Sequence, residues 1–445
     1  MRRDGDELSK PRAIDFAVIF PGEEKASEFA NHFETLGYIV EKNPVDDRAE
    51  YPWDVHVATV MAPTFDGIRN FESTLDAIAQ PLGGRNDGWG CFAIKEDEAA
   101  GVTDLSKIEF PEEFREGARN AVTTCLRIQP EEKVTLITDE ACITIAASLA
   151  AELDKRGCTW NAFVLEQIAP RPLNGMPREV LDDMETSQVS IFAVQVQPNE
   201  LRSRMDMTDV VNRRHMRHAH MVNITPEVMV EGMRADFNAV DRLSQVVLDK
   251  VRKASYVRAT TPAGTNIRAE LNPAYKWFKT SGIISPEKWG NLPGGECFTA
   301  PGEVNGTFVV DGVVGDFLCA RYGILRETPL TIEIAANRIT SVASENKELE
   351  REFWSYTHTD ENSDRVGEFA IGTNIGVSRV IGNILQDEKF PGIHIAFGDP
   401  YGAHTGAPWK STTHIDVVGL EFSIWLGGPD GEEQIMRDGK FLVHG

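Results

Sequence analysis

Apolar residues in the N-terminal part of the chain switch between strand-like runs and helix-like spacing. The run at 14–20 is typical of a strand, and one helix face would collect Ala26, Phe29, Ala30, Phe33 and Leu36. Strand-like segments at 38–40 and 53–62 and a helical segment at 64–80 follow, and 83–90 is rich in glycine. The order β-α-β-β-α-β predicts a ferredoxin-like domain, which we place at residues 1–98.

The spacing changes after residue 112, where short apolar runs alternate with a longer helical segment. Runs at 134–138, 159–165 and 189–195 predict strands, and 142–156 predicts a helix that ends at Gly157. This alternation predicts a small doubly wound α/β domain at 105–250. The sequence contains neither G-x-G-x-x-G nor G-x-x-x-x-G-K-[ST], so no nucleotide-binding fingerprint is present.

Strands dominate the C-terminal half, where Gly and Pro turns separate short apolar segments. The expected strands lie at 255–260, 266–271, 307–313, 330–334 and 338–341, with helices near 346–355 and 375–386. We therefore expect a β-rich metal-binding domain at 251–445. The predicted fold class is α/β plus α+β, with a ferredoxin-like, a doubly wound and a β-rich part.

The composition of the chain limits which classes of partner it can bind and indicates its cellular compartment. The 445 residues are 41% apolar and carry 45 basic against 69 acidic side chains, for a formal charge of −24. Such a surface repels nucleic acid and anionic membranes, and no apolar run reaches the length of a membrane span. Six cysteines without a C-x-x-C pair, behind a polar N-terminal segment, predict a reduced, cytoplasmic protein.

Candidate metal ligands gather in the C-terminal part. His414 and Asp416 lie two residues apart in a strand-like segment, so both side chains point to one face and can reach one ion. His394, Glu368 and Tyr401 also lie beside glycine turns. Imidazole nitrogen and carboxylate oxygen suit Zn, Mn, Co or Fe(II).

Glu296 adds a carboxylate far upstream of these residues, directly after the Pro-Gly-Gly turn at 293–295. A carboxylate at the start of a strand is well placed to point into a cleft. So many charged groups are costly to bury together unless a metal ion or hydrogen bonds compensate.

At these residues the sequence resembles the M29 family of metalloaminopeptidases, also called the aminopeptidase T or aminopeptidase S family. The resemblance covers roughly residues 112–445, through Gly-Gly-Glu-Cys-Phe-Thr-Ala-Pro at 294–301, Gly-Glu at 367–368, Asp-Glu-Lys at 387–389, His-Ile-Ala-Phe-Gly at 394–398, Tyr401 and His-Ile-Asp at 414–416. It implies that two divalent ions are held by Glu296, Glu368, His394, Tyr401, His414 and Asp416. It also implies a homodimer with the site enclosed between domains.

The activity that this resemblance implies is release of N-terminal residues from peptides by a metal-activated water, with Zn, Co or Mn as the ions. Glu296, Glu368 and Tyr401 would be the catalytic residues, with either glutamate able to pass a proton to the leaving amine. Glu388 and Lys389 would orient ligands and stabilise charge. The chain departs from the family in its extra N-terminal domain and its shorter α/β part, so we expect a remodelled substrate pocket.

Other interpretations stay open. His394, His414 and Asp416 also match the facial triad of mononuclear Fe(II), and the scaffold resembles that of the 2,5-dihydroxypyridine ring-cleaving dioxygenases. Glu296 argues against this, because those enzymes have an apolar residue in the corresponding turn. A one-metal hydrolase of a small aromatic or amide substrate lies between the two, and a non-catalytic binding protein is the third interpretation.

About the first hundred residues resemble the ribonuclease E inhibitor B family, through the strand at 14–20, Leu-Gly-Tyr at 36–38 and Asp-Gly-Trp-Gly at 87–90. This resemblance implies a small α+β interaction domain, for which a role in oligomerisation or in covering the active site is open beside nuclease inhibition. Elsewhere, His215, His218 and His220 form a basic segment that either binds a metal or an anion or ends a solvated helix.

Overall fold

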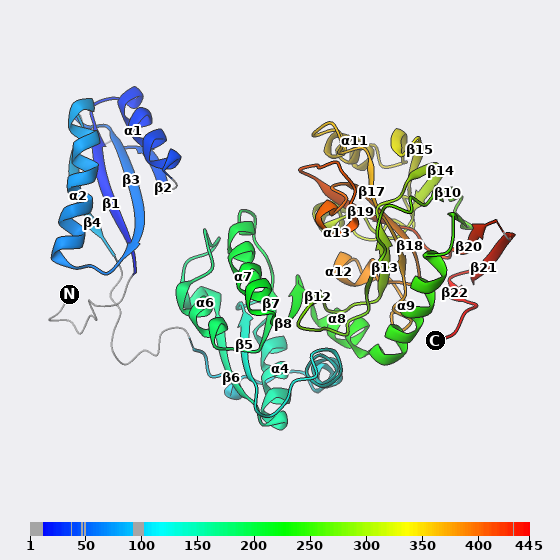
Figure 1. Ribbon diagram of the computed structural model, residues 1–445. Helices are drawn as coiled ribbons and strands as arrows, with labels where there is room; N and C mark the ends of the chain where they lie inside the picture. Colours follow the sequence, from blue (N-terminus) through cyan, green and yellow to red (C-terminus); the bar gives the residue numbers. More distant parts are fainter. Residues whose placement is uncertain (1–11, 37, 46–47, 49, 92–101, 430) are drawn as a thin grey trace. The chain divides into compact units, whose positions relative to one another are not determined.

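The computed structural model describes residues 12–36, 38–45, 48, 50–91, 102–429 and 431–445 (Figure 1). The chain divides into two compact units, Met1–Ala100 and Gly101–Gly445. Within the described residues, every helix is too short or too polar to cross a membrane.

The N-terminal unit is a four-stranded antiparallel sheet with two helices. Its elements are β1 (Arg12–Phe20), α1 (Glu23–Thr35), β2 (Ile39–Pro44), β3 (Trp53–Met61), α2 (Phe65–Ala79) and β4 (Arg85–Gly90). Ile14, Phe16, Val18 and Phe20 alternate along β1 into a core that also holds Phe29 of α1. The strand order β2-β3-β1-β4 confirms the predicted ferredoxin-like arrangement.

A five-stranded parallel sheet opens the second unit, with strand order β12-β8-β7-β5-β6. Its strands are β5 (Lys133–Thr138), β6 (Thr159–Val164), β7 (Val189–Val194), β8 (Arg217–Val222) and β12 (Gly290–Asn291). The helices around it are α3 (Arg115–Arg119), α4 (Ile143–Arg156), α5 (Leu165–Ile168), α6 (Arg178–Glu185), α7 (Leu201–Arg214), α8 (Pro226–Val230) and α9 (Phe237–Val251). Because β5 has β6 on one side and β7 on the other, the strand order reverses at β5, as in doubly wound folds.

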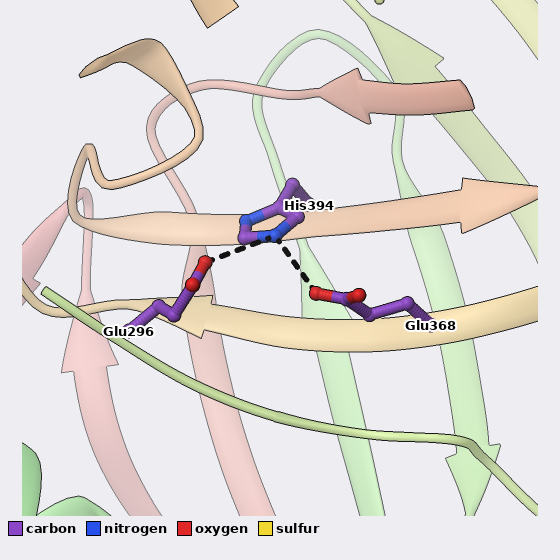
Figure 2. Close-up of side chains that lie close together, drawn as sticks. All are labelled: Glu296, Glu368 and His394. Atoms are coloured by element: carbon purple, nitrogen blue, oxygen red, sulfur yellow. Dashed lines mark ion pairs between the residues drawn. The ribbon is translucent and has the colours of Figure 1, made fainter. Parts of the chain in front are cut away.

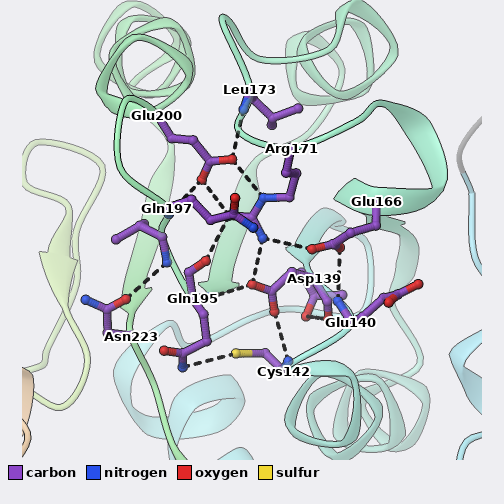
Figure 3. Close-up of polar contacts among 12 residues, drawn as sticks. Asp139, Glu140, Cys142, Glu166, Arg171, Leu173, Gln195, Gln197, Glu200 and Asn223 are labelled. Atoms are coloured by element: carbon purple, nitrogen blue, oxygen red, sulfur yellow. Dashed lines mark hydrogen bonds and ion pairs between the residues drawn. The ribbon is translucent and has the colours of Figure 1, made fainter. Parts of the chain in front are cut away.

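The crevice at that reversal point is filled by the chain's own Arg171 (Figure 3). Its guanidinium lies 2.9 Å from Asp139 Oδ2, 3.0 Å from Glu166 Oε1 and 2.5 Å from Glu200 Oε2. It also donates to the backbone oxygen of Gln195 at the end of β7. Burial raises the pKa of Glu200, but Arg171 and two backbone N–H groups outweigh it and lower that pKa. A crevice that in other doubly wound folds receives a ligand is here held shut by an ion-pair network.

The C-terminal part holds two antiparallel sheets, ordered β11-β13-β17-β18-β19 and β16-β15-β14-β10-β9-β20-β21-β22. The first comprises β11 (Phe278–Thr280), β13 (Glu296–Thr299), β17 (Val366–Gly372), β18 (Gly392–Gly398) and β19 (His414–Val418). The second comprises β9 (Tyr256–Thr260), β10 (Asn266–Glu270), β14 (Glu303–Val310), β15 (Leu330–Ala335), β16 (Arg338–Ala343), β20 (Ser423–Gly428), β21 (Gly431–Arg437) and β22 (Lys440–Phe441). The short helices are α10 (Asp316–Tyr322), α11 (Lys347–Tyr356), α12 (Ile384–Asp387) and α13 (Gly402–Thr405).

Along the strands of the five-stranded antiparallel sheet, successive side chains point to opposite faces, with apolar side chains on one face and charged ones on the other. Alternate residues such as Cys297, Ile371, Ile395 and Val417 join the core that includes the eight-stranded sheet. The residues between them point to the opposite face, because neighbouring side chains on a strand point to opposite sides. That second face carries the candidate site.

Two sequence predictions in this region are wrong. The helix expected near 375–386 is mostly irregular and only Ile384–Asp387 is helical, because the buried Asp387 carboxylate accepts from the backbone N–H groups of Ile381, Gly382 and Asn383 and draws the chain into a loop. The strand expected at 307–313 ends at Val310, after which the chain turns at Gly312 towards β19.

The histidine-rich segment does not form one surface cluster. His215 ends α7 in the left-handed conformation, with φ 52°, and is exposed. His218 and His220 lie on β8, buried, with their rings 5.4 Å apart. Burial lowers the pKa of both imidazoles, to about 3 for His220, so both are neutral side chains of the interior.

Replacing Arg171 by Met should destabilise the second unit strongly. The change leaves Asp139 and Glu200, which are 1% and 3% exposed, without their cation, at a cost of about 3–5 kcal/mol. Urea unfolding followed by tryptophan fluorescence measures the loss. Arg178→Met is the matched control, because the pair of Arg178 with Asp182 is 80% and 56% exposed and should shift nothing measurable. Equal midpoints for the two variants would contradict the role of Arg171.

Candidate metal centre

The candidate ligands lie on four neighbouring strands of one sheet, on the face away from the core. Glu296 begins β13, Glu368 lies on β17, His394 on β18, and His414 and Asp416 on β19. Strand register sets their spacing: Ala370 pairs with His394, and Ala396 lies between Glu368 and Asp416. Because alanines occupy these central positions, no bulky side chain fills the space between the charged groups.

His394 lies between two carboxylates (Figure 2). Its Nε2 is 3.5 Å from Glu296 Oε2 and 3.5 Å from Glu368 Oε1. His414 continues the chain of contacts, with Nε2 3.7 Å from Glu368 Oε2 and 3.6 Å from Asp416 Oδ1. Glu296 and Glu368 therefore flank the imidazole of His394, and His414 links Glu368 to Asp416.

The His394 imidazole is 1% exposed, and among the described residues neither of its nitrogens has a hydrogen-bond partner. Leaving a buried polar group unpaired is costly, so the imidazole requires something that binds nitrogen. A divalent metal ion meets that requirement, since imidazole nitrogen and carboxylate oxygen are its usual ligands. The residues present thus fit a metal.

Two sets of ligand atoms lie close enough together for such an ion. One set is Glu296, Glu368 and His394, and the other is Glu388, His394 and Asp416, with the ligand atoms of each set within 4.8 Å of one another. The structure thus brings Glu388 beside the predicted ligands. The sequence signal for it was the Asp-Glu-Lys run at 387–389, which gave no information on distance.

Lys389 is the permanent cation of the site. It is 1% exposed, and its Nζ lies 2.7 Å from Glu296 Oε1 and 2.5 Å from Glu388 Oε1. The Thr280 hydroxyl donates to the same Glu296 oxygen at 2.7 Å. Lys389 and Thr280 therefore hold one oxygen of Glu296, and the other faces His394. Burial raises the pKa of Glu296, but Lys389 and His394 outweigh it and lower that pKa.

Tyr401 lies at the exposed margin of the site. Tyr401 has φ 49°, in the left-handed region, and the residue is 44% exposed. The centre of its ring lies 4.5 Å from that of His414. His414 Nδ1 contacts the backbone oxygen of Asp399 at 2.9 Å, which directs Nε2 towards the carboxylates. Desolvation and the nearby carboxylates raise the pKa of Tyr401 well above its ordinary value, so without a metal the phenol is neutral.

The carboxylates also act on the two histidines. Burial would lower their pKa values, but Glu368 and Glu296 raise the pKa of His394 to about 9, and Asp416 raises that of His414 to about 10. Both imidazoles are therefore protonated at neutral pH in the metal-free protein. A metal ion must displace those protons to bind.

Metal affinity should therefore fall as the pH falls. Because both pKa values lie above 8, protons compete with the metal throughout the range from pH 8 to pH 6, and the affinity should drop about tenfold or more per pH unit. Calorimetric titration with Co²⁺ at pH 6, 7 and 8 measures the affinity. Repeating it in two buffers of different ionisation enthalpy counts the protons released. An affinity that does not change with pH would contradict displacement of protons from His394 and His414.

Comparison with known proteins agrees with the geometry. Residues 234–441 match the family model of the thermophilic metalloproteases (M29), and residues 1–91 match that of regulator of ribonuclease activity B. No curated protein sequence matches the chain significantly.

Two solved structures share the fold. Wild-type AmpT from Thermus thermophilus is 16% identical, with a TM-score of 0.55 over 74% of this chain and 99% of that one. The 2,5-dihydroxypyridine dioxygenase from Pseudomonas putida KT2440 is 14% identical, with a TM-score of 0.54 over 74% of this chain and 97% of that one. The ligand-bearing sheet lies inside the region that the first family model covers. The chain thus carries a domain at residues 234–441 that matches the thermophilic metalloprotease (M29) family and a domain at residues 1–91 that matches regulator of ribonuclease activity B.

Proposed function

We propose that the protein is a metal-dependent aminopeptidase. The observation that carries the proposal is His394, a buried imidazole whose nitrogens lack hydrogen-bond partners and whose Nε2 lies 3.5 Å from the carboxylates of Glu296 and Glu368, in a domain that matches a metalloprotease family. Glu296, Glu368, His394, Tyr401, His414 and Asp416 would hold two divalent ions, Zn, Co or Mn. The substrates are peptides with a free amino end.

Bound divalent ions would supply a nucleophilic water at neutral pH and polarise the scissile carbonyl. The chain's own residues keep the rest of the site in order. Lys389 fixes Glu296 and Glu388 and offsets part of their charge. Burial raises the pKa of Glu388 to about 8, near the pH at which a carboxyl group can both accept and donate a proton. Tyr401, at the exposed margin, is placed to contact a substrate that enters from solvent.

A second candidate is a mononuclear Fe(II) dioxygenase. It is favoured by the position of His394, His414 and Asp416 on one sheet face and by the fold shared with the dioxygenase from Pseudomonas putida. Glu296 argues against it, because this carboxylate lies 3.5 Å from His394 and adds an oxygen ligand to the site. A one-metal hydrolase of a small aromatic or amide substrate would share the same ligands.

The metal content decides between these candidates. Protein purified without added metal should bind two Zn²⁺, Co²⁺ or Mn²⁺ per chain and hydrolyse Leu-p-nitroanilide and dipeptides. Mass spectrometry for metals and an absorbance assay with each ion measure both properties. One Fe(II) per chain with O₂ uptake and no peptide turnover would overturn the aminopeptidase proposal.

Replacing Glu296 by Ala should lower the metal content by at least one ion and reduce kcat by about a hundredfold or more, because the change removes a ligand and leaves Lys389 without one of its two carboxylates. Glu303→Ala is the control, since Glu303 is exposed on β14 in the other sheet. Metal analysis and peptide turnover are measured on both variants. Full metal content in Glu296→Ala would remove Glu296 from the ligand set.

We also propose a cytoplasmic homo-oligomer. Leu201 and Met205 lie one turn apart on α7 and are 60% and 51% exposed, so they form a small apolar patch. Contiguous exposed apolar patches mark interaction sites more often than single exposed residues do.

A further inference from the structure

A cavity of about 610 Å³ lies along the free edge of β11, beside the C-terminal end of α9. Four cationic side chains line it, Arg252, Lys276, Lys279 and Lys288, together with Trp277 and other apolar residues. Among the described residues that line this cavity, none is acidic. In a chain with 69 acidic and 45 basic residues this is a local reversal of charge, and such a reversal attracts anions.

The charges in the cavity are only partly neutralised by the protein. Lys279 pairs with Asp241 at 2.8 Å, whereas Arg252 donates to the backbone oxygen of Trp277. Lys288 Nζ donates to the backbone oxygen of Lys279 at 2.5 Å. In the part of the chain that the structure describes, no carboxylate lies within ion-pair distance of Lys288. Its ammonium group therefore has donors left for an anionic ligand.

The cavity begins where the metal-binding face ends. Thr280 of β11 lies opposite Glu296 of β13, and Phe278 lies opposite Phe298, so Phe278 points to the same face as Glu296. Lys288 Nζ stands 5.3 Å from the centre of the Phe278 ring. Phe278 and Lys288 both line the cavity, so together they form its border with the candidate metal centre.

The distance from the metal centre to this border fits a short peptide. Register places His394, Ala370, Phe298 and Phe278 in one row across β18, β17, β13 and β11. Three strand spacings correspond to about 14 Å, and an extended peptide advances about 3.4 Å per residue. A peptide of four residues spans about 14 Å, so with its amino end at the metal centre it would bring its carboxylate to Lys288.

We propose that this cavity receives the C-terminal carboxylate of short peptide substrates and that Lys288 is the residue that binds it. The inference rests on the proposed aminopeptidase function and narrows its substrates to free peptides of about four residues. A charge-assisted hydrogen bond from an ammonium to a carboxylate is stronger than a neutral one and is lost when the carboxylate is an amide.

The test compares Leu-Gly-Gly-Gly with its C-terminal amide. The metal-loaded wild-type protein should hydrolyse the free acid with a kcat/KM about tenfold higher than the amide, mostly through a lower KM. Lys288→Gln should lower the kcat/KM for the free acid about tenfold and thereby abolish this preference. Lys253→Gln is the matched control, because Lys253 is an exposed lysine close to the cavity in sequence but does not line it, and it should keep the preference.

The possible failures are distinct. Hydrolysis of acid and amide at equal kcat/KM by the wild type would overturn the role of the cavity and leave the aminopeptidase proposal standing. No hydrolysis of either peptide with any metal would overturn the aminopeptidase proposal itself. Calorimetry of the metal-free protein measures the affinity for each peptide without turnover. Equal affinity for the free acid and its amide would contradict the inference. If Lys253→Gln also loses the preference for the free acid over the amide, that preference comes from the overall positive charge near the cavity and not from Lys288.

Discussion

Repulsion between carboxylates on one face of the five-stranded antiparallel sheet is the constraint that the surrounding residues must offset. Glu296, Glu368, Glu388 and Asp416 share that face, and Lys389 is the one permanent cation in contact with two of them. Carboxylates so close together are stable only when cations offset them. In the metal-free protein, the protonated imidazoles of His394 and His414 offset part of the negative charge. The same carboxylates that raise the pKa values of these histidines also attract divalent ions.

The parallel-sheet part of the second unit supports this face and contributes none of its candidate ligands. Leu292, at the end of the segment that leads to Glu296, donates its backbone N–H to the oxygen of His220 on the parallel sheet. Residues of α9 lie in the core beneath the metal-binding face as well as in that of the parallel sheet. The parallel sheet in turn is closed at its usual ligand crevice by Arg171. The parallel-sheet part of the unit thus has its usual ligand position occupied by its own ion pairs, and it packs against the part that carries the metal-binding face.

The sequence predicted the ferredoxin-like order and the alternation of strands and helices well, because apolar spacing is a local property that each segment carries by itself. It failed at 375–386, where apolar spacing suggested a helix. There a buried carboxylate, Asp387, takes the backbone donors that a helix would have used. The site followed the same rule. Two-residue spacing was enough to place His414 and Asp416 on one face, whereas the closeness of Glu388 to His394 depends on a turn that no periodic pattern records.

The consecutive residues Asp387, Glu388 and Lys389 have three different structural roles. Asp387 anchors the preceding loop, Glu388 faces His394 and Asp416, and Lys389 neutralises Glu296. Because the order of these roles is fixed by chain direction, an insertion that shifted the run by one residue would put Glu388 where Lys389 belongs, and a deletion would put Phe390 there. The length of this loop is therefore under a tighter physical constraint than its composition.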